Sequence, residues 1–335
     1  MTMDGPARGG TVSVVIPAHR AAATIARAVD SALAEAVVAE VIVVLDGPDD
    51  VLHAAVPKDP KDPRVRLSVL EKSRGAAAAR NAGLALAAQE FVLFLDADDF
   101  VEDGLIAALA AAAGEADLAF GPFAFAFPSG RRIEVDVAKT IGRPQVVDVL
   151  KAWFRGDYVP CCAVLWRTRF VRAIGGWAED LLRNQDGELV WRACLVGPRL
   201  ALAGAGRGIY MQSLAPGRVS ATRSRAMYEQ QFALFARTEA QLAPWLLPQV
   251  AAELGGMYYR LARTAYYDGL SDIGRQAEFA ARHFCRTGQD GTRLHRLVAR
   301  LIGLENKERL CSGLHRTRHA VGLLPPSRDL VPVER

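Results

Sequence analysis

Three acids directly follow an apolar run in the stretch EFVLFLDADDF, residues 90–100. Asp96, Asp98 and Asp99 stand within four positions of one another, and two further acids follow at Glu102 and Asp103. Carboxylates this close repel one another, so a positive group is expected among them. Two or three carboxylates at one strand end are typical of a hard divalent cation bound through oxygen, with water and phosphate completing its shell.

Helix capping is the alternative explanation for these acids. One aspartate ahead of a helix expected over residues 101–113 could accept backbone N–H bonds and stabilise that helix by about 1 kcal/mol. A cap uses one acid or two, however, and leaves the remaining acids unexplained. We therefore favour the interpretation as a metal site.

The elements that must position these acids alternate between strands and helices. Strands are expected at 11–17, 40–46, 64–70 and 90–95, and helices at 21–36 and 75–89. The strands are apolar on nearly every position, which is typical of strands buried on both faces. The alternation predicts an α/β fold with a mostly parallel, Rossmann-like sheet. Because ligands gather beyond the carboxyl ends of such strands, Asp46 and the acids from Asp96 to Asp99 are expected at one edge.

The later part of the chain follows a different pattern. Residues 122–137 read as antiparallel strands or loop, residues 145–154 and 186–197 as helices, and the chain from residue 223 onward as almost entirely helical. We place a domain boundary near residue 220, which divides the chain into residues 1–220 and a C-terminal helical region, residues 221–335.

Composition excludes several classes of protein. The 335 residues carry a net charge of +4. The stretch from Arg282 to His319 contains nine basic residues and only three acids. The five cysteines are irregularly spaced and contain no C-x-x-C pair, so neither a disulfide framework nor a zinc site is indicated. The N-terminal residues lack the apolar core of a signal peptide, and no apolar run reaches the roughly 18 residues that span a bilayer. We expect a chain in a reducing cytoplasm, either soluble or resting on a membrane surface.

Four motifs occur in a characteristic order: VSVVIPAHR, VIVVLDGPDD, SRGAAAARNAGLALAAQEFVLFLDADD and IGGWAEDLLRNQDGELVWR. This succession resembles the inverting family 2 glycosyltransferases of the GT-A fold over residues 12–220. Relatives typically carry P-T-Y-N, D-D-G-S-x-D, N-x-G-x-x-x-A-R-N-x-G, L-D-x-D-D, and G-G-F-x-E followed by E-D-x-x-L-x-x-R. The Arg80-Asn81 pair with the acidic strand end after it is the most specific part of the match.

The resemblance implies a site for a nucleoside-diphosphate sugar. Asp46 matches the residue that accepts from the uracil N3–H, and His19 falls where the family often packs an aromatic residue on the base. Pro17 is a further residue expected to bind the nucleotide sugar. Arg80 matches an arginine that contacts the nucleotide or diphosphate, and Asp96 the acid that holds the ribose, the sugar or a metal-bound water. The alternatives are that Asp46 is a turn residue, that His19 has no role because the family's aromatic residue is replaced, and that Arg80 is a solvated side chain.

The resemblance also implies the chemistry. Asp98 matches the ligand of Mn²⁺ or Mg²⁺ bound to the diphosphate, and such a cation stabilises the negative charge of the departing group. Asp186 matches the base that takes the proton from the acceptor hydroxyl, which inverts the anomeric centre in one displacement. The alternative for Asp186 is a helix cap. Arg192, further along the same helix, is expected to pair with an acid and fix the helix orientation.

Three departures from the family pattern affect these assignments. Leu45 replaces the first acid of the D-D pair, and Gln185 replaces the glutamate before the expected base. Many relatives place a histidine before the P-G-x-x-S stretch, where this chain has Leu214 and Ala215. Recognition of the base and the ligand set of the metal are therefore expected to differ from the family pattern.

The segment TRLHRLVARLIGL, residues 292–304, has the pattern of an amphipathic helix. Its apolar positions and arginines are Leu294, Leu297, Val298, Leu301, Arg293, Arg296 and Arg300. One reading is a helix packed on its domain with solvated arginines. The other is attachment to anionic lipid headgroups, which suits a lipid-linked acceptor.

We conclude from the sequence that the chain is a metal-dependent inverting glycosyltransferase. It would move a sugar from a nucleoside-diphosphate sugar, expected to be UDP-linked, to a glycan or polyprenyl-linked acceptor in bacterial surface-polysaccharide biosynthesis. It would act in the cytoplasm, in peripheral contact with the inner face of the plasma membrane if the basic helix binds lipid. The alternative is a non-catalytic nucleotide-sugar-binding or scaffold relative. No G-x-G-x-x-G follows the first strand, no P-loop is present, and no nucleic-acid motif occurs.

Overall fold

The computed structural model describes residues 10–57, 62–212, 223–284 and 292–320, with side chains up to residue 314. The described residues up to 212, except 154–156, form one compact unit, and residues 154–156 with those from 223 onward form a second. The boundary predicted near residue 220 falls in the segment 213–222, outside the described residues. We call the first the catalytic unit, after the activity that the resemblance leads us to expect of it, and the second the helical unit.

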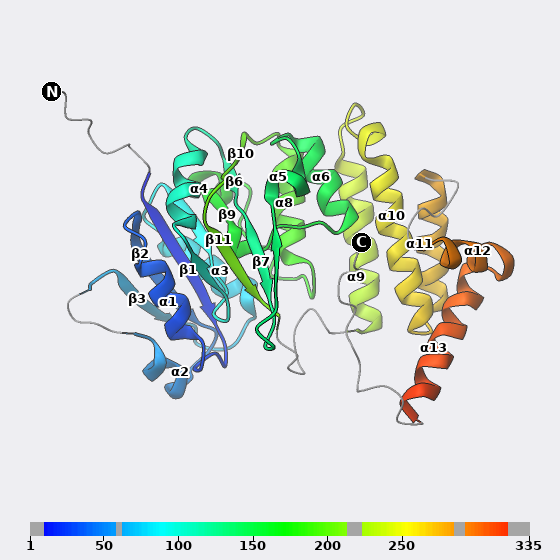
Figure 1. Cartoon of the computed structure of the whole chain (residues 1–335), viewed down its shortest axis with the longest axis horizontal. Helices are drawn as coiled ribbons and strands as arrows, with labels where there is room; N and C mark the ends of the chain where they lie inside the picture. The colour runs from blue at the N-terminus through cyan, green and yellow to red at the C-terminus, as the bar shows by residue number, and fades with distance from the viewer. Residues whose placement is uncertain (1–9, 58–61, 213–222, 285–291, 321–335) are drawn as a thin grey trace. The chain divides into compact units, whose positions relative to one another are not determined.

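A seven-stranded sheet forms the core of the catalytic unit (Figure 1). In spatial order its strands are β10 (Leu200–Leu202), β6 (Leu118–Phe120), β9 (Val164–Arg167), β4 (Phe91–Phe94), β1 (Val12–Ala18), β2 (Val38–Leu45) and β3 (Val65–Val69). Strand β9 runs antiparallel to both of its neighbours, and the other described pairings are parallel. The predicted α/β fold with a mostly parallel sheet is confirmed.

Helices connect and cover these strands. They are α1 (Ile25–Leu33), α2 (Asp50–Ala55), α3 (Ala76–Leu86), α4 (Leu105–Ala113), α5 (Val137–Ile141), α6 (Val146–Arg155), α7 (Thr168–Ala173) and α8 (Gln185–Leu195), with a short 3₁₀ turn η1 (Cys161–Ala163). Every residue of β1 is buried, as its apolar sequence predicts. Gly83 lets α3 approach β1 closely, because a Cβ at this position would lie 2.3 Å from Val15 Cγ1.

A second, four-stranded sheet lies at residues 100–211. Its order is β5 (Phe100–Glu102), β11 (Arg207–Met211), β7 (Phe123–Ala126) and β8 (Arg132–Val135). The antiparallel pair β7–β8 confirms the first of the two alternatives for residues 122–137, antiparallel strands rather than loop. The helix expected to start at residue 101 was placed too early. Val101 pairs with Gly208 in β5, and positive φ angles at Asp103 and Gly104 turn the chain before α4 begins.

The acids after β4 do not cap α4. The residue before the helix is Gly104, which offers no side-chain acceptor. The carboxylate of Glu35 accepts instead, with 3.0 Å bonds from the N–H groups of Ile106 and Ala107. The capping explanation for the acid cluster is therefore wrong, because a residue 71 positions away supplies the cap.

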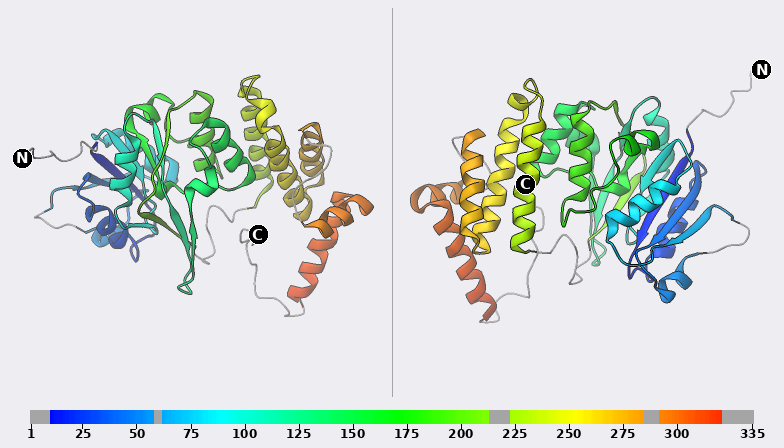
Figure 2. Two further views of the ribbon diagram at one scale, coloured as in Figure 1. Left: turned by 45° about the horizontal axis from the view of Figure 1, so that its top comes forward. Right: turned by 180° about the vertical axis from the view of Figure 1, so that it is seen from behind.

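The helical unit contains the run of helices predicted from residue 223 onward. They are α9 (Arg225–Gln241), α10 (Leu247–Tyr267), α11 (Ser271–Phe284), α12 (Arg293–Ile302) and α13 (Leu304–Ala320). Helix α10 packs against α9, α11 and α13, and α12 packs against α13 (Figure 2). Pro248 lies in the first turn of α10, where no N–H is needed, so this helix accommodates it. None of the described helices is both long and apolar enough to cross a bilayer.

Candidate active site at the carboxyl edge of the sheet

Three adjacent parallel strands end at the same edge of the seven-stranded sheet, and the residues predicted to bind the nucleotide sugar lie at these ends. Strand β1 lies between β4 and β2, and Ala18 at its end pairs with Leu45. The Asp46 N–H then donates to the Ala18 carbonyl at 2.9 Å. Leu95, which precedes the acid cluster, donates to the carbonyl of Val15 at 3.0 Å. Parallel pairing therefore puts Asp46 and the acids after Leu95 at the same edge of the sheet.

Asp46 holds the loop that leads into α3. Its Oδ1 accepts from the N–H groups of Arg74 at 2.7 Å and Gly75 at 3.1 Å. Its Oδ2 accepts from the Ser73 hydroxyl at 2.7 Å and from the Gly75 N–H at 2.9 Å. Burial by itself would raise the pKa of Asp46, but these donors and the charge of nearby His19 hold that pKa below its ordinary value. Asp46 is therefore a carboxylate at neutral pH.

Pro17 and His19 flank this position in different ways. Pro17 is buried within β1 and pairs with Val44. His19 is exposed at the strand end, near enough to Asp46 to affect its titration. Arg20 after it adopts a left-handed φ of 51°, so the chain turns sharply at this edge.

The three clustered acids have three different surroundings. Asp96 Oδ1 accepts a 2.6 Å hydrogen bond from Arg80. Asp99 is fully buried, and its Oδ1 accepts from the N–H of Met211 at 2.8 Å. Asp98 is partly buried, and its carbonyl accepts from Arg27 at 2.8 Å. The protein's own donors therefore compensate part of the negative charge of the acid cluster. From the sequence, this role is expected of a bound cation and the diphosphate.

Arg80 occupies the centre of the site. Only 5% of it is exposed, so it is not the solvated side chain of the alternative reading. Its guanidinium carbon lies 4.3 Å from the centre of a Trp177 ring, and Nη1 donates to Gln185 at 3.4 Å. Its buried Nε has no hydrogen-bond partner among the described residues. Arg80 thus connects the end of β4 with the start of α8.

Asp186 lies in the first turn of α8, next to Gln185. Burial raises the pKa of Asp186 above its ordinary value, the charge of Arg80 partly opposes this rise, and the charge of Asp96 adds to it. Asn184, which precedes the helix, has a left-handed φ of 62° and provides no side-chain cap. The geometry thus brings Asp96, Arg80 and Asp186 within electrostatic range of one another.

A network that the sequence analysis did not anticipate fixes the loop before α8. Asn81 donates to the carbonyl of Trp177 and to Glu179, both at 2.9 Å, and accepts from the Trp177 N–H at 2.8 Å. Arg192 pairs with Glu188 at 2.7 Å, as expected, and also donates to the carbonyl of Gly176. These contacts hold Trp177 against Arg80. The sequence signal for them was the G-G-W-A-E motif, whose role we had not assigned.

The protein oxygens at this site suit a hard cation only if the substrate supplies some of the cation's other ligands. No group of three or more His, Cys, Asp or Glu side chains able to hold a metal occurs among the described residues. Asp98 and Asp96 offer carboxylate oxygens, the donor type that Mg²⁺ and Mn²⁺ take. A cation held by one or two carboxylates together with substrate phosphates fits this set.

Comparison with known proteins agrees with this architecture. Residues 13–170 match the model of the family described as Glycosyl transferase family 2. The succinoglycan biosynthesis protein ExoO of Rhizobium meliloti (strain 1021) is 47% identical over 91 residues, 27% of this chain. The matched segment spans about a quarter of that relative, 26% of its length.

Two solved structures share the fold at 16% sequence identity. S. aureus TarS 1–349 in complex with UDP-GlcNAc has a TM-score of 0.55 and covers 82% of this chain and 92% of its own. The mannosyltransferase PcManGT from Pyrobaculum calidifontis, in complex with GDP-Man and Mn²⁺, has a TM-score of 0.53 and covers 95% and 87%. Identity this low supports a GT-A fold and nothing finer. The family model, which matches residues 13–170, identifies this part of the chain as a member of glycosyl transferase family 2.

Proposed function

We propose that this chain is an inverting glycosyltransferase that moves a sugar from a nucleoside-diphosphate sugar to an acceptor hydroxyl. The observation that carries the proposal is the position of Arg80, whose guanidinium contacts Asp96 at the end of β4 and Gln185 at the start of α8. The charge of Arg80 would thus be shared by Asp96, the acid proposed to bind the sugar donor, and Asp186, the proposed base. Inversion is the mechanism that family 2 implies.

Asp186 is the proposed general base. A base must be ionised to accept the acceptor's proton, and it accepts more readily when its pKa lies closer to the working pH. The raised pKa of Asp186 meets the second condition, and the charge of Arg80 limits the rise so that the first can also be met. In the proposed step the acceptor O–H bond breaks toward Asp186 while its oxygen bonds to the anomeric carbon and the diphosphate leaves.

Arg80 and Asp96 are proposed to act on the charged part of the donor. Asp96 keeps 28% of its side chain exposed despite the bond to Arg80, so it can still reach a sugar or ribose hydroxyl. Arg80 is enclosed, so in this proposal it acts on the donor through its charge and through its hold on Asp96.

Asp46, Pro17 and His19 are the proposed surroundings of the nucleotide base. A carboxylate has about four acceptor positions, and the Gly75 N–H takes two of them on Asp46, so a base N–H would replace one of these two bonds. A carboxylate acceptor at this position supports a uracil-type base and a UDP-linked donor. The UDP-GlcNAc bound to TarS supports the same class of donor.

Asp98 is the proposed protein ligand of Mn²⁺ or Mg²⁺. When bound, such a cation would supply positive charge for the departing diphosphate. The Mn²⁺ bound with GDP-Man in PcManGT supports this assignment. Arg27, which holds the backbone of Asp98 through its carbonyl, would help to keep this residue in position.

The acceptor is proposed to be a growing glycan or a polyprenyl-linked sugar in a bacterial surface polysaccharide. The similarity to a succinoglycan biosynthesis protein supports this part of the proposal. A non-catalytic relative that binds nucleotide sugars without turnover is the competing function.

Donor turnover with matched variants tests the proposal. Release of UDP or GDP from a panel of nucleotide sugars would be measured with Mn²⁺, with Mg²⁺ and with EDTA. We expect turnover to require the metal and to fall by about 10²–10⁴-fold in Asp186→Asn, whereas binding of UDP measured by calorimetry is retained. Asp98→Asn should instead weaken metal-dependent binding of UDP. Asp103→Asn, which alters an exposed acid in the same segment, is the control and should behave as the wild type.

Two results would contradict the proposal. Turnover that persists in Asp186→Asn would remove the base assignment. A wild-type protein that binds UDP with Mn²⁺ but turns over none of the donors would favour the non-catalytic function.

A further inference from the structure

Helix α12 presents its apolar side chains to solvent. Leu294, Leu297 and Leu301 are 69%, 55% and 74% exposed. A helix on the surface of a water-soluble domain ordinarily turns this face toward the core. The three leucines recur at the spacing of one helix face, so the exposure forms a stripe rather than scattered positions. Of the two readings of this helix left open by the sequence, packing through its leucines does not apply to the described structure.

A polar side chain anchors α12 instead. His295 is the buried residue of this helix, and its Nε2 lies 3.0 Å from the hydroxyl of Tyr259 on α10. Its Nδ1 lies 3.8 Å from Glu308 on α13, which also accepts from Arg263 and Lys307 at 3.0 Å. The inward face of α12 is therefore polar and the outward face apolar. An apolar stripe left outside in this way is complementary to a second apolar surface or phase.

The charge on α12 identifies that phase. The helix carries three arginines and no acid, and among the described residues Arg293 and Arg300 form no ion pair. Leu310 and Leu314 of α13, the helix that packs against α12, are 58% and 64% exposed. Leucines flanked by arginines without acids are complementary to a bilayer whose headgroups are anionic.

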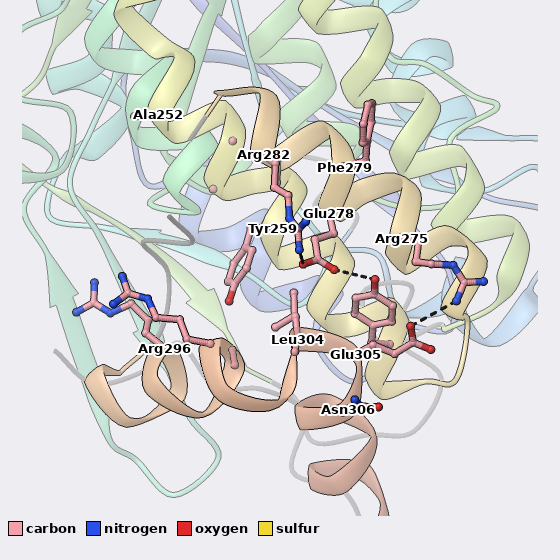
Figure 3. Close-up of a pocket in the computed structure, with 17 residues that line it drawn as sticks. Ala252, Tyr259, Arg275, Glu278, Phe279, Arg282, Arg296, Leu304, Glu305 and Asn306 are labelled. Carbon is pink, nitrogen blue, oxygen red and sulfur yellow. Dashed lines mark hydrogen bonds and ion pairs between the residues drawn. The ribbon is translucent and has the colours of Figure 1, made fainter. Parts of the chain in front are cut away.

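A pocket beside α12 adds to this positive character. It has a volume of about 820 Å³ and is lined by residues of α10, α11, α12 and α13 (Figure 3). Its charged lining residues are Arg275, Arg282, Arg296, Arg300, Glu278 and Glu305. Figure 3 shows that Glu278 is engaged by Arg282 and Glu305 by Arg275. The lining contains four arginines and two glutamates, so its formal net charge is positive. A lipid phosphate would meet this charge next to the leucine stripe.

We propose that the leucine stripe of α12, together with the exposed leucines of α13, is a docking surface for an anionic lipid bilayer. The leucines enter the boundary between headgroups and acyl chains, and the arginines contact lipid phosphates. This surface lies wholly within the helical unit and does not depend on the chemistry proposed for the catalytic unit.

Sedimentation of the full chain with lipid vesicles tests the proposal. We expect binding to vesicles of phosphatidylcholine with about one third phosphatidylglycerol, and little binding to phosphatidylcholine alone. Leu294→Ser, Leu297→Ser and Leu301→Ser combined should weaken binding at least about tenfold. Arg293→Gln with Arg300→Gln should weaken it by about fivefold per arginine at low salt.

Matched controls distinguish binding through this surface from nonspecific binding of the protein to vesicles. Val51→Ser removes an aliphatic side chain that is 73% exposed in the catalytic unit, and it should not change vesicle binding, whereas Leu301→Ser should. Lys139→Gln removes a charge whose side chain is 86% exposed, and it should also bind as the wild type. Because the leucines do not hold α12 on its unit, the serine variants should keep the circular dichroism spectrum and melting temperature of the wild type.

Three outcomes would overturn the proposal. The first is a wild type that does not bind the anionic vesicles. The second is binding that survives the triple serine change. The third is a concentration-dependent dimer, detected by light scattering, that the triple change abolishes while no vesicle binding occurs; this would assign the surface to a second copy of the chain.

Discussion

The Arg80 guanidinium lies 2.6 Å from Asp96, and the two side chains differ in exposure, 6% for the arginine and 28% for the aspartate. The cation is thus enclosed while the carboxylate still reaches the open side of the site. This asymmetry lets one ion pair serve two purposes. It neutralises charge at a crowded strand end, and it leaves an acid available to a ligand.

Replacing Arg80 should destabilise the catalytic unit more than replacing a surface arginine. Arg80→Ala leaves Asp96 without its partner beside Asp186 and removes the contact with Trp177, so we expect the free energy of unfolding to fall by about 3 kcal/mol. Arg132→Ala, which breaks an ion pair with Glu102 nearer the surface, should cost about 1 kcal/mol or less. Urea unfolding of both variants measures the difference. Equal losses would show that the Arg80 pair behaves as a surface pair.

The acidic limb of the pH–rate profile should report Asp186. Its raised pKa places the loss of kcat/KM on acidification at a higher pH than an ordinary aspartate would. Arg80→Gln removes a charge that lowers this pKa, so the limb should move to still higher pH in the activity that remains. Asp103→Asn should leave the limb in place. A limb that is unmoved in Arg80→Gln would mean that another group titrates.

Asp186 should lower stability at neutral pH. A carboxyl whose pKa is raised by folding favours its protonated form, so its contribution to stability declines as pH rises from the unfolded pKa through the folded one. Asp186→Asn keeps the shape without the charge, and we expect a higher melting temperature at pH 7 together with the loss of turnover. The gain should shrink toward pH 3. A lower melting temperature at pH 7 would contradict this account.

Asp46 should have the opposite effect on stability. Its pKa is lowered by folding, so its contribution is present above the unfolded pKa and is lost as pH falls through the folded one. Asp46→Asn loses charge-assisted bonds to the loop at 73–75, and we expect a loss of about 2 kcal/mol at pH 7 that becomes smaller in acid. Chemical unfolding at pH 7 and pH 3 tests this. Asp50→Asn, on the neighbouring helix α2, is the control.

Gly83 should resist substitution although it lies inside a helix. Alanine ordinarily stabilises a helix by about 1 kcal/mol relative to glycine. At Gly83 its Cβ would lie 2.3 Å from Val15, and overpacking of this kind costs about 1–3 kcal/mol. Gly83→Ala should therefore lower the melting temperature, whereas Gly313→Ala, in α13 with nothing within 4 Å, should raise it. A stabilising Gly83→Ala would show that α3 can move away from β1.

Several features of the fold were predictable because they depend on local pattern. Buried strands read as continuous apolar runs, and chain connectivity then forces Asp46 and the acids after β4 to one edge of the sheet. The misplaced start of α4 shows where this reasoning fails. Val101 belongs to a strand only because Gly208, more than 100 positions later, pairs with it.

The contacts of individual site residues were not predictable. The bond from Asn81 to Trp177 spans 96 positions, and that from Arg80 to Gln185 spans 105. Nothing in the local sequence indicates that Glu35 rather than an aspartate caps α4. Such pairs depend on which side chains the packed elements bring within about 3 Å of one another, and sequence periodicity carries no information at that scale.

The sequence by itself determined the order of the first strands and helices and the edge of the sheet where the acids stand, because hydrophobic pattern and connectivity are enough to specify them. The family was indicated by the resemblance of the four motifs. Only the tertiary structure decided that Arg80 is enclosed against Trp177 and Asp96, and that α12 turns its leucines outward. The physical reason is the same in both cases. Amphipathicity and charge are properties of a segment, whereas the direction that a side chain faces depends on what its neighbours offer in space.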